Sequence, residues 1–331
     1  MTMPLTDAPI VTIVGGSGFV GRYIAQGMAR RGWRVRVACR RPNEAHFVRP
    51  YGVVGQVEPV QCNIRDDESC RAVIAGARAV VNCVGVLAEQ GRNTFDAVQA
   101  EGAGRVARVA AEEGAAQMVH ISAIGADPES DSAYARTKAE GERLVREAFP
   151  AAVILRPSIV FGAEDKFFNR FASMARLSPV IPVIGGSTRF QPVWVKDVAE
   201  AACVAAEGGA EPGLYELGGP EIYTFRELMR LMLRVIRRRR AIVEIPFWAA
   251  RIQGAVLQNL PGAPLTLDQV RLLVRDNVVS EGARGFEALG IEPGAPEGIV
   301  ESYLYPYRPY GQYATLDDER DAERDREDGP R

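Results

Sequence analysis

A glycine-rich turn near the start of the chain constrains the fold more than any other feature. The run IVTIV at 10–14 is short, apolar and β-branched, as expected of a buried parallel strand. It is followed by Gly15, Gly16, Gly18 and Gly21 and then by a segment with helical spacing. Such glycines permit a tight turn and let the backbone approach a pyrophosphate at the start of the helix. The pattern predicts a dinucleotide-binding unit; the alternative is a turn that is tight only for packing.

Strands and helices alternate along the first half of the chain. Apolar runs predict strands at 34–39, 79–85 and 117–123, and another that begins at 151. Amphipathic segments predict helices at 67–77, 95–114 and 132–149. Strands that alternate with helices form parallel sheets covered on both faces. We therefore expect an α/β fold, a Rossmann doubly wound parallel sheet, with a smaller C-terminal lobe.

The predicted domains follow from this rhythm. A nucleotide-binding Rossmann domain takes 8–165 and is rejoined by a strand and helix at about 191–207. The smaller lobe takes 166–190 and 208–300. From 301 to 331 the chain is first rich in Tyr and Pro and then almost wholly charged, which predicts an extended, partly disordered tail.

Within the smaller lobe three local predictions are specific. The segment 166–178 has helical spacing, and PVIPVIGG at 179–186 predicts a loop broken by Pro and Gly. A helix at 224–240 begins at Thr224, with Glu227 in the position of a capping box.

Composition excludes several kinds of site. The 331 residues carry a formal net charge of −2, which gives no general attraction to nucleic acid. The only histidines, His46 and His120, lie far apart in sequence, so we expect no His-based metal site. Five cysteines form no C-x-x-C pair, and their apolar neighbours predict buried thiols in a reducing compartment.

The end of the second predicted strand indicates which dinucleotide binds. An Asp or Glu there would accept a hydrogen bond from the ribose 2′-hydroxyl of NAD. This chain has Arg40 and Arg41 instead, and guanidinium groups favour a 2′-phosphate through bidentate, charge-assisted hydrogen bonds. We expect NADP(H), and specifically NADPH; the alternative is a pair of solvated surface arginines.

The motifs in order are VGGSGFVG, VVNCVG, HIS, YARTK, RPSIVFG and QPVWVKDVA, and together they cover about two thirds of the chain. In this order they resemble the short-chain dehydrogenase/reductase superfamily, in its extended or atypical branch. The segment FGAEDKFFNRFASM, followed by QPVWVKDVA, is similar to the NADPH-binding accessory subunits of respiratory complex I, the NADH:ubiquinone oxidoreductase.

The resemblance implies a role for each matching residue. Tyr134 would exchange a proton with a substrate, and Lys138, one helical turn on, would lower the Tyr pKa and bind the nicotinamide ribose. Asn63 and Ile64 would flank the adenine, although Asp is commoner at position 63. The residues expected at the nucleotide are Gly15, Ser17, Gly18, Phe19, Val20, Gly21, Arg40, Arg41, Asn63, Ile64, Val84, Gly85, Ser122, Tyr134, Lys138, Pro157, Ser158, Ile159 and Val160.

One departure from the family pattern bears on catalysis. The catalytic hydroxyl usually follows the strand end that is written HIS here, and this chain has Ala123 in that position. Without a hydroxyl to hold a substrate carbonyl, that part of transition-state stabilisation is lost. We therefore expect no catalytic residue, with Tyr134 and Lys138 as ribose clamps; a one-residue shift in the alignment would make both catalytic.

Three functions remain open. The first is a non-catalytic accessory subunit of complex I whose bound NADPH stabilises assembly. The second is an active NADP-dependent reductase, dehydratase or epimerase. The third is a redox-sensing regulator that binds NADP(H) and a partner protein.

The second half of the chain suggests partner surfaces. Arg226, Arg230 and Arg234 recur at i,i+4 on the helix predicted at 224–240, a stripe suited to anionic lipid or an acidic partner. The segment from Ser302 is expected to be ordered only against other complex I subunits, in the peripheral arm near the membrane.

The sequence also suggests where the protein acts. We find no signal peptide ahead of the first predicted strand and no apolar stretch long enough to span a bilayer. We expect a peripheral protein, without a transmembrane helix, on the cytoplasmic face of a bacterial inner membrane.

Overall fold

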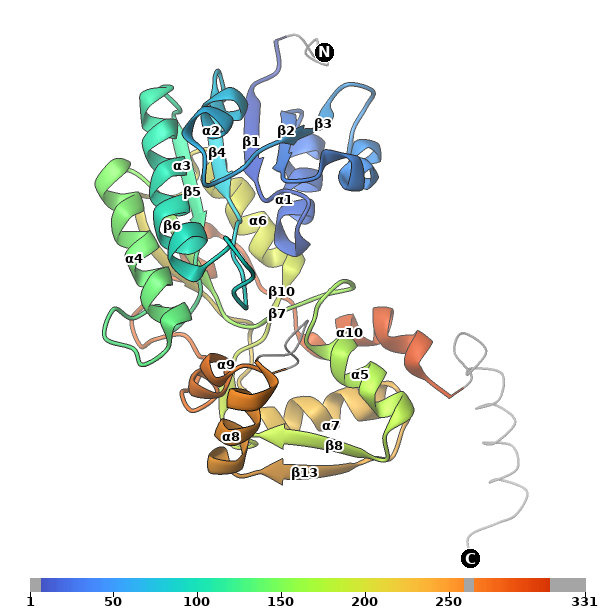
Figure 1. Ribbon diagram of the computed structural model, residues 1–331. Helices are drawn as coiled ribbons and strands as arrows, with labels where there is room; N and C mark the ends of the chain where they lie inside the picture. The colour runs from blue at the N-terminus through green and yellow to red at the C-terminus, as the bar shows by residue number, and fades with distance from the viewer. Residues whose placement is uncertain (1–6, 259–264, 310–331) are drawn as a thin grey trace, which may run out of the picture.

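A seven-stranded parallel sheet forms the centre of the molecule (Figure 1). The structure is a computed structural model that describes residues 7–258 and 265–309. The strand order in the sheet is β11-β6-β5-β4-β1-β2-β3, so successive strands are added outward from β1 in both directions. This arrangement confirms the Rossmann fold class. The strands are β1 (Ile10–Val14), β2 (Arg34–Cys39), β3 (Val57–Gln61), β4 (Ala79–Asn82), β5 (Gln117–Ile121), β6 (Val153–Pro157) and β11 (Gly213–Leu217).

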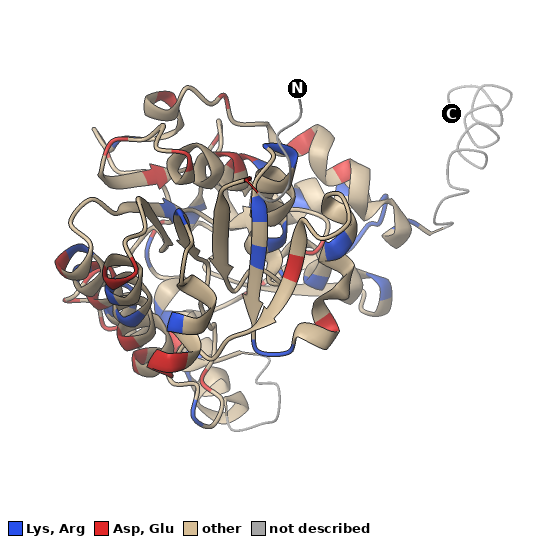
Figure 2. Cartoon of the chain, turned by 90° about the horizontal axis from the view of Figure 1, so that it is seen from above, with Lys and Arg blue, Asp and Glu red and all other residues tan. Residues whose placement is uncertain are grey.

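Helices cover both faces of this sheet because side chains alternate along its strands. Val81 faces the core under α1 (Phe19–Arg30) and α6 (Val195–Ala206), whereas its neighbour Val80 faces the opposite core. That second face carries α2 (Asp67–Ile74), α3 (Glu101–Glu112) and α4 (Ala133–Ala148). Seen from above, acidic and basic residues alternate along the outer helices (Figure 2). Ion pairs such as Arg143 with Glu140 at 2.7 Å form between them.

The smaller lobe has its own apolar core. It packs α5 (Phe168–Leu177), α7 (Phe225–Val235) and α10 (Pro296–Leu304) against the parallel pair β8 (Val180–Ile184) and β13 (Ala241–Ile245). The helices α8 (Phe247–Leu257) and α9 (Leu267–Leu272) form a satellite cluster beside it. Thr224 caps α7 and forms a capping box with Glu227, as predicted.

Short elements complete the fold. Two-residue strands pair as β7 (Val160–Phe161) with β10 (Val193–Trp194) and as β9 (Arg189–Phe190) with β12 (Tyr223–Thr224). Four further helical turns are η1 (Pro42–Tyr51), η2 (Asp96–Ala100), η3 (Phe286–Leu289) and η4 (Tyr305–Tyr307). η2 is a π-helical turn that leads directly into α3.

Three local predictions in the second half of the chain are wrong. The expected loop at 179–186 contains β8, because Ile181 and Val183 alternate into the lobe core despite the prolines around them. β11 lies within the range assigned to the smaller lobe, yet it pairs with β6 at the edge of the main sheet. α7 ends at Val235 rather than at 240, and Arg237 follows with a left-handed φ of 53°.

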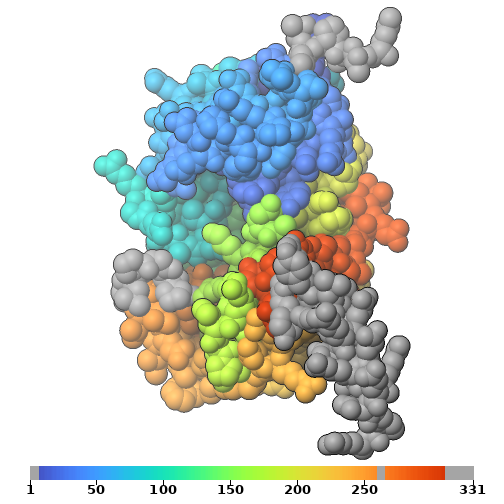
Figure 3. All heavy atoms as spheres, turned by 90° about the vertical axis from the view of Figure 1, so that its right-hand side faces the viewer, coloured from blue at the N-terminus to red at the C-terminus, as the bar shows by residue number. Residues whose placement is uncertain are grey.

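The predicted extended tail is also wrong where the structure describes it. α10 runs through Leu304 and is followed by η4, and Val300 and Leu304 are both fully buried in the lobe core. Figure 3 shows α10, in red, on the molecular surface beside the green α5. The charged segment at 310–331 lies outside the described residues.

Candidate nucleotide site

The residues expected at the nucleotide gather along one edge of the main sheet. Parallel strands end at the same edge, so the loops after β1, β2, β3, β4, β5 and β6 converge there. These loops carry Gly15, Arg40, Asn63, Val84 and Ser122, while Pro157 ends β6 and Ser158 follows it. Tyr134 and Lys138 lie on α4, which follows β5. The structure therefore brings together the elements that carry the whole predicted set.

The turn after β1 leaves room for a phosphate at the start of α1. Gly15 adopts a left-handed φ of 82°, which favours glycine, and its N–H donates to the Ala38 carbonyl at 2.8 Å. A Cβ on Gly21 would lie 2.6 Å from the Gly15 oxygen, so this position excludes a side chain. Gly18 caps α1, and as a glycine it has no side chain to accept a hydrogen bond from the helix start. The N–H groups around Ser17, Phe19 and Val20 and the positive end of the helix dipole suit an anion.

The arginines expected at the ribose follow β2 directly. Arg40 and Arg41 are both exposed, so their side chains can turn toward a ligand. Arg41 pairs with Glu44 at 3.1 Å, and because both side chains are largely solvated the pair is weak. Cys39, the last residue of β2, is buried, and burial raises the pKa of its thiol. Arg40 is the better candidate for a 2′-phosphate, because within residues 7–258 and 265–309 no acidic side chain pairs with it.

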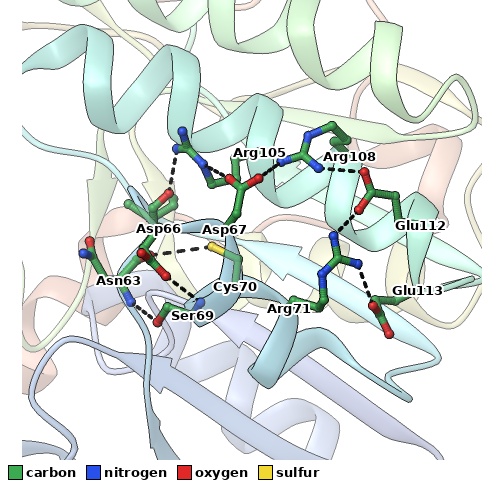
Figure 4. Close-up of polar contacts among 11 residues, drawn as sticks. Asn63, Asp66, Asp67, Ser69, Cys70, Arg71, Arg105, Arg108, Glu112 and Glu113 are labelled. Carbon is green, nitrogen blue, oxygen red and sulfur yellow. Dashed lines mark hydrogen bonds and ion pairs between the residues drawn. The ribbon is translucent and has the colours of Figure 1, made fainter.

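The loop after β3, expected to flank the adenine, is held by α2 (Figure 4). The Asn63 N–H donates to Ser69 Oγ at 2.9 Å, and Asp66 caps α2 by accepting from the Ser69 N–H at 2.7 Å. Arg105 of α3 donates to the Ile64 carbonyl at 3.0 Å, and Ile64 itself is 8% exposed. Asp67, Arg71, Arg108, Glu112 and Glu113 extend this network of ion pairs between α2 and α3. The adenine side of the site is therefore anchored in the outer helices.

Tyr134 and Lys138 lie one turn apart on α4, beneath the ends of β4 and β5. Lys138 is 4% exposed, and its Nζ donates to the Ile121 carbonyl at 3.1 Å. Burial lowers the pKa of Lys138 to about 8. Burial, and then the charge of Asp268, raises the pKa of Tyr134 to about 12. Tyr134 is therefore a neutral phenol at neutral pH, able to donate a proton or a hydrogen bond.

Buried polar groups near Lys138 support the fit of a polar ligand. Gln99 lies on the η2 turn, and its amide oxygen is buried without a hydrogen-bond partner in the part of the chain that is described. A Cβ built on Gly85 would lie 3.5 Å from Lys138 Nζ and 3.7 Å from that amide oxygen. Unsatisfied buried acceptors are rare, so this position favours a donor brought by a ligand or water. The Gly-lined turn thus suits the central pyrophosphate of a dinucleotide, and this polar corner would suit the ribose on its nicotinamide side.

The hydroxyl of Ser122 is already engaged inside the protein. Ser122 Oγ donates to Glu142 Oε1 at 2.5 Å, and Glu142 is 1% exposed. Arg156 donates to both Glu142 carboxylate oxygens at 2.7 Å, which makes a buried, bidentate pair. Ser122 therefore fixes the end of β5 to α4 and β6 rather than offering its hydroxyl to a ligand, and Ala123 follows it.

Two residues that the sequence did not predict hold the site together. Asp268 of α9 accepts from the Ser132 hydroxyl and the Ala133 N–H, both at 2.8 Å, and from the Tyr134 N–H at 3.2 Å. Asn277 accepts from the Ser158 hydroxyl at 2.7 Å and from the Ile159 N–H at 3.1 Å. Both contacts span more than a hundred residues, so no local pattern could reveal them. The capping box of Thr266 and Gln269 marks only the helix on which Asp268 lies.

Residues 11–218 of the chain match the NAD dependent epimerase/dehydratase family in sequence. The chain belongs to that family. It is 35% identical to a subunit 9 of the NADH dehydrogenase [ubiquinone] 1 alpha subcomplex from Arabidopsis thaliana mitochondria, over 91% of this chain and 79% of that protein. It is 30% identical to the mitochondrial NADH-ubiquinone oxidoreductase 40 kDa subunit of Neurospora crassa, over 91% of this chain and 80% of that protein. It is also 32% identical to a ceramide reductase of Caulobacter vibrioides, over 92% and 97%.

Solved structures agree on the family fold. An NADPH-dependent quinone oxidoreductase of Escherichia coli, complexed with NADPH, has a TM-score of 0.70 at 16% identity, covering 89% of this chain and 99% of that one. A Thermus thermophilus UDP-glucose 4-epimerase in complex with NAD has a TM-score of 0.64 at 19% identity, covering 89% and 98%.

Within residues 7–258 and 265–309, no group of three or more His, Cys, Asp or Glu side chains is arranged to hold a metal ion. In the same part of the chain, no helix has the length and apolar character needed to cross a bilayer.

Proposed function

We propose that this family member is a nucleotide-binding accessory subunit of respiratory complex I, in which the bound nucleotide stabilises the assembly and is not turned over. The observation that carries the proposal is the similarity, across about nine tenths of the chain, to proteins that are themselves named as complex I subunits. The partners would be other subunits of the peripheral arm near the membrane, with a possible contact to anionic lipid.

Two features of the site support binding without turnover. The position expected to carry the catalytic hydroxyl is Ala123, and the adjacent Ser122 hydroxyl is bound to Glu142. A carbonyl in the site would therefore lack one of the donors that polarise it in the active enzymes of this superfamily. Tyr134 and Lys138 remain placed to hold a ribose by hydrogen bonds.

The nucleotide in this proposal is NADPH. Arg40 follows β2 where an acidic side chain would select NAD, and it is exposed and able to meet a 2′-phosphate. The helix dipole and the free N–H groups of α1 would bind the pyrophosphate, and Asn63 with Ile64 would flank the adenine. Val84 and Gly85 would line the ribose path, and the segment from Pro157 to Val160 would face the nicotinamide.

The proposed location is the membrane face that carries complex I, where the protein would be held peripherally. The relatives named as complex I subunits are mitochondrial proteins, so they do not support the bacterial inner membrane predicted from the sequence. The membrane attachment itself does not depend on that point.

A pair of variants separates assembly from catalysis. Gly18→Val should empty the site, because a Cβ there already lies 3.1 Å from the Gly15 oxygen and a larger group would fill the phosphate position. It should lower the amount of assembled complex I. Tyr134→Phe should leave NADH oxidation by membranes nearly unchanged, because the phenol transfers no proton in this proposal and supplies only one of several hydrogen bonds to the nucleotide. Gly298→Val is the matched control, since a Cβ at Gly298 meets nothing within 4 Å.

The readouts are complex I content on native gels and NADH oxidation by membranes. If Gly18→Val and Tyr134→Phe reduce respiration equally, with complex I content unchanged in both, the site is catalytic and the proposal fails.

A second candidate is an NADPH-dependent reductase of a lipid carbonyl. It is favoured by the ceramide reductase relative, of which the chain covers 97%, and by a Tyr134 phenol that is neutral at physiological pH. In that reaction Tyr134 would donate its proton to the carbonyl oxygen. Purified protein should then oxidise NADPH with a long-chain keto-lipid, and Tyr134→Phe should slow this by roughly 10²–10⁴-fold.

A further inference from the structure

A strongly basic groove runs along the smaller lobe, away from the nucleotide site. It lies between α7 and β13 and has a volume of about 1180 Å³. Seven arginines line it: Arg226, Arg230 and Arg234 on one face of α7, and the four consecutive arginines 237–240. The single acidic lining residue is Glu227, which is engaged in the capping box of α7. A chain with a net charge of −2 therefore concentrates positive charge on this surface.

The contacts described for the groove's arginines are of two kinds, an ion pair and hydrogen bonds to backbone carbonyls. Arg226 is paired, with Glu244 at 2.6 Å. Arg238 and Arg240 donate to the carbonyls of Tyr307 and Ala175, both at 2.8 Å, which orients the guanidinium groups without compensating them. Burial, and then the charges of Arg240 and Arg176, lower the pKa of Arg238. Arg238 and Arg240 are therefore held near each other although their positive charges repel.

One of these arginines occupies a backbone position that suits glycine. Arg237 has a φ of 53°, and the Arg238 N–H beyond it donates back to the Leu233 carbonyl at 3.1 Å. A helix end of this type normally carries glycine in the left-handed position, because a Cβ is disfavoured there. An arginine in this position adds a positive charge to the groove although a left-handed backbone disfavours its side chain.

Exposed apolar side chains lie on β13, on α8 that follows it, and at the end of α5. β13 leads from the groove into α8, where Trp248 and Ile252 are 68% and 60% exposed at i,i+4. Val243 on β13 is also exposed, and so is Leu177, which ends α5 close to the Ala175–Arg240 hydrogen bond. Figure 1 shows α7, β13 and α8 together in the lower part of the molecule. Arginines beside an exposed Trp and aliphatic side chains form the combination found at bilayer interfaces.

We propose that the α7–β13 groove and the exposed face of α8 form one membrane-docking surface, in which the arginines bind the phosphates of anionic lipids and Trp248 with Ile252 enters the headgroup region. The charge complementarity selects anionic over neutral lipid. The apolar border favours a bilayer over an acidic protein, because a purely electrostatic partner would leave Trp248 and Ile252 exposed. The docking surface rests on the proposed function, because it supplies the contact for the peripheral membrane attachment proposed there. Lipid binding by this surface requires no other complex I subunit.

Vesicle flotation with the purified full-length protein tests the surface. The vesicles are phosphatidylcholine alone, and phosphatidylcholine with phosphatidylglycerol at roughly two to one. The protein should float with the anionic vesicles only, and added salt should release it because exposed charges are screened. The double variant Arg230→Glu/Arg234→Glu should bind at least about tenfold more weakly. The control Arg78→Glu/Arg146→Glu makes the same charge change at exposed arginines of the main domain, and should bind as wild type.

Two further variants separate docking from folding. Trp248 is the exposed one of the three tryptophans, so its fluorescence should shift to the blue on anionic vesicles, and Trp248→Phe should abolish the shift. Arg237→Gly relieves the strain of the left-handed backbone and removes one positive charge, so it should weaken vesicle binding; its melting temperature is measured alongside.

Several results would contradict the proposed membrane-docking surface. These are equal binding to neutral and anionic vesicles, equal losses in the two charge-reversal variants, or no fluorescence shift. Binding to polyglutamate but not to vesicles would assign the groove to an acidic protein. A concentration-dependent dimer lost in Arg230→Glu/Arg234→Glu would assign it to a second copy. None of these results bears on co-purification with complex I, so failure here is distinguishable from failure of the proposed function.

Discussion

The residue that decides nucleotide choice is Arg40, which follows β2 and is exposed beside the phosphate loop. An acidic side chain there would repel a 2′-phosphate and accept a hydrogen bond from a 2′-hydroxyl. Arg40→Asp should therefore shift the bound nucleotide from NADP(H) toward NAD(H) and weaken NADPH binding by roughly tenfold or more. Arg41→Asp should do less, since Arg41 already pairs with Glu44. Nucleotide extracted from purified protein reports the outcome; mainly NAD(H) in the wild type would refute the assignment.

His120 gives the fold a dependence on pH. It is 1% exposed in β5, and burial, followed by the charge of Lys138, lowers its pKa to about 3. The unfolded chain binds a proton near pH 6.5 and the folded chain does not, so stability is lost as pH falls below about 6.5. The loss attributable to His120 should reach about 2 kcal/mol at pH 5.

The measurement is urea unfolding of the wild type and His120→Leu between pH 7 and pH 5. The variant will have its own stability offset, so only the two pH slopes are compared. The wild type should lose more stability than the variant over this range. Identical slopes would show that His120 carries no such linkage.

At the scale of elements, α4 depends on a cap supplied by a distant helix. Asp268 of α9 accepts from Ser132 Oγ and from two N–H groups in the first turn of α4. Asp268→Ala should destabilise the protein by about 1–2 kcal/mol and loosen nucleotide binding, since Tyr134 lies in that first turn. Glu147→Ala removes an exposed pair with Arg143 on the same helix and should change stability by less than about 0.5 kcal/mol. Equal effects would mean that Asp268 is an ordinary surface carboxylate.

The C-terminal helix α10 is an element of the fold rather than a strip ordered by partners. Leu304 is fully buried in the lobe core, while the next residue, Tyr305, is 43% exposed. Leu304→Ala should lower the free energy of unfolding by roughly 2–5 kcal/mol, and Tyr305→Ala by much less. Chemical denaturation of the two variants measures the difference. A small effect at Leu304 would restore the prediction that the segment from Ser302 is ordered only against partner subunits.

At the scale of the whole molecule, the sequence predicts what local patterns encode. The apolar β-branched strands, the glycine turn and the Tyr134-x-x-x-Lys138 spacing are all contained within a few residues, and they gave the Rossmann sheet and the elements around the site. β8 and α10 were missed because Pro-rich composition masks burial that only the folded lobe creates. Asp268, Asn277 and the Glu142–Arg156 pair were missed because their partners are remote in sequence or on another element.

The most direct test of the account is whether the protein travels with complex I. Native membranes are solubilised in mild detergent and separated on a native gel, and the band with NADH dehydrogenase activity is probed for this protein and for its nucleotide. The protein should be found in that band together with NADPH, and the Gly18→Val variant should be depleted from it. A protein that migrates alone, beside a fully assembled and active complex I that does not contain it, would contradict the central claim.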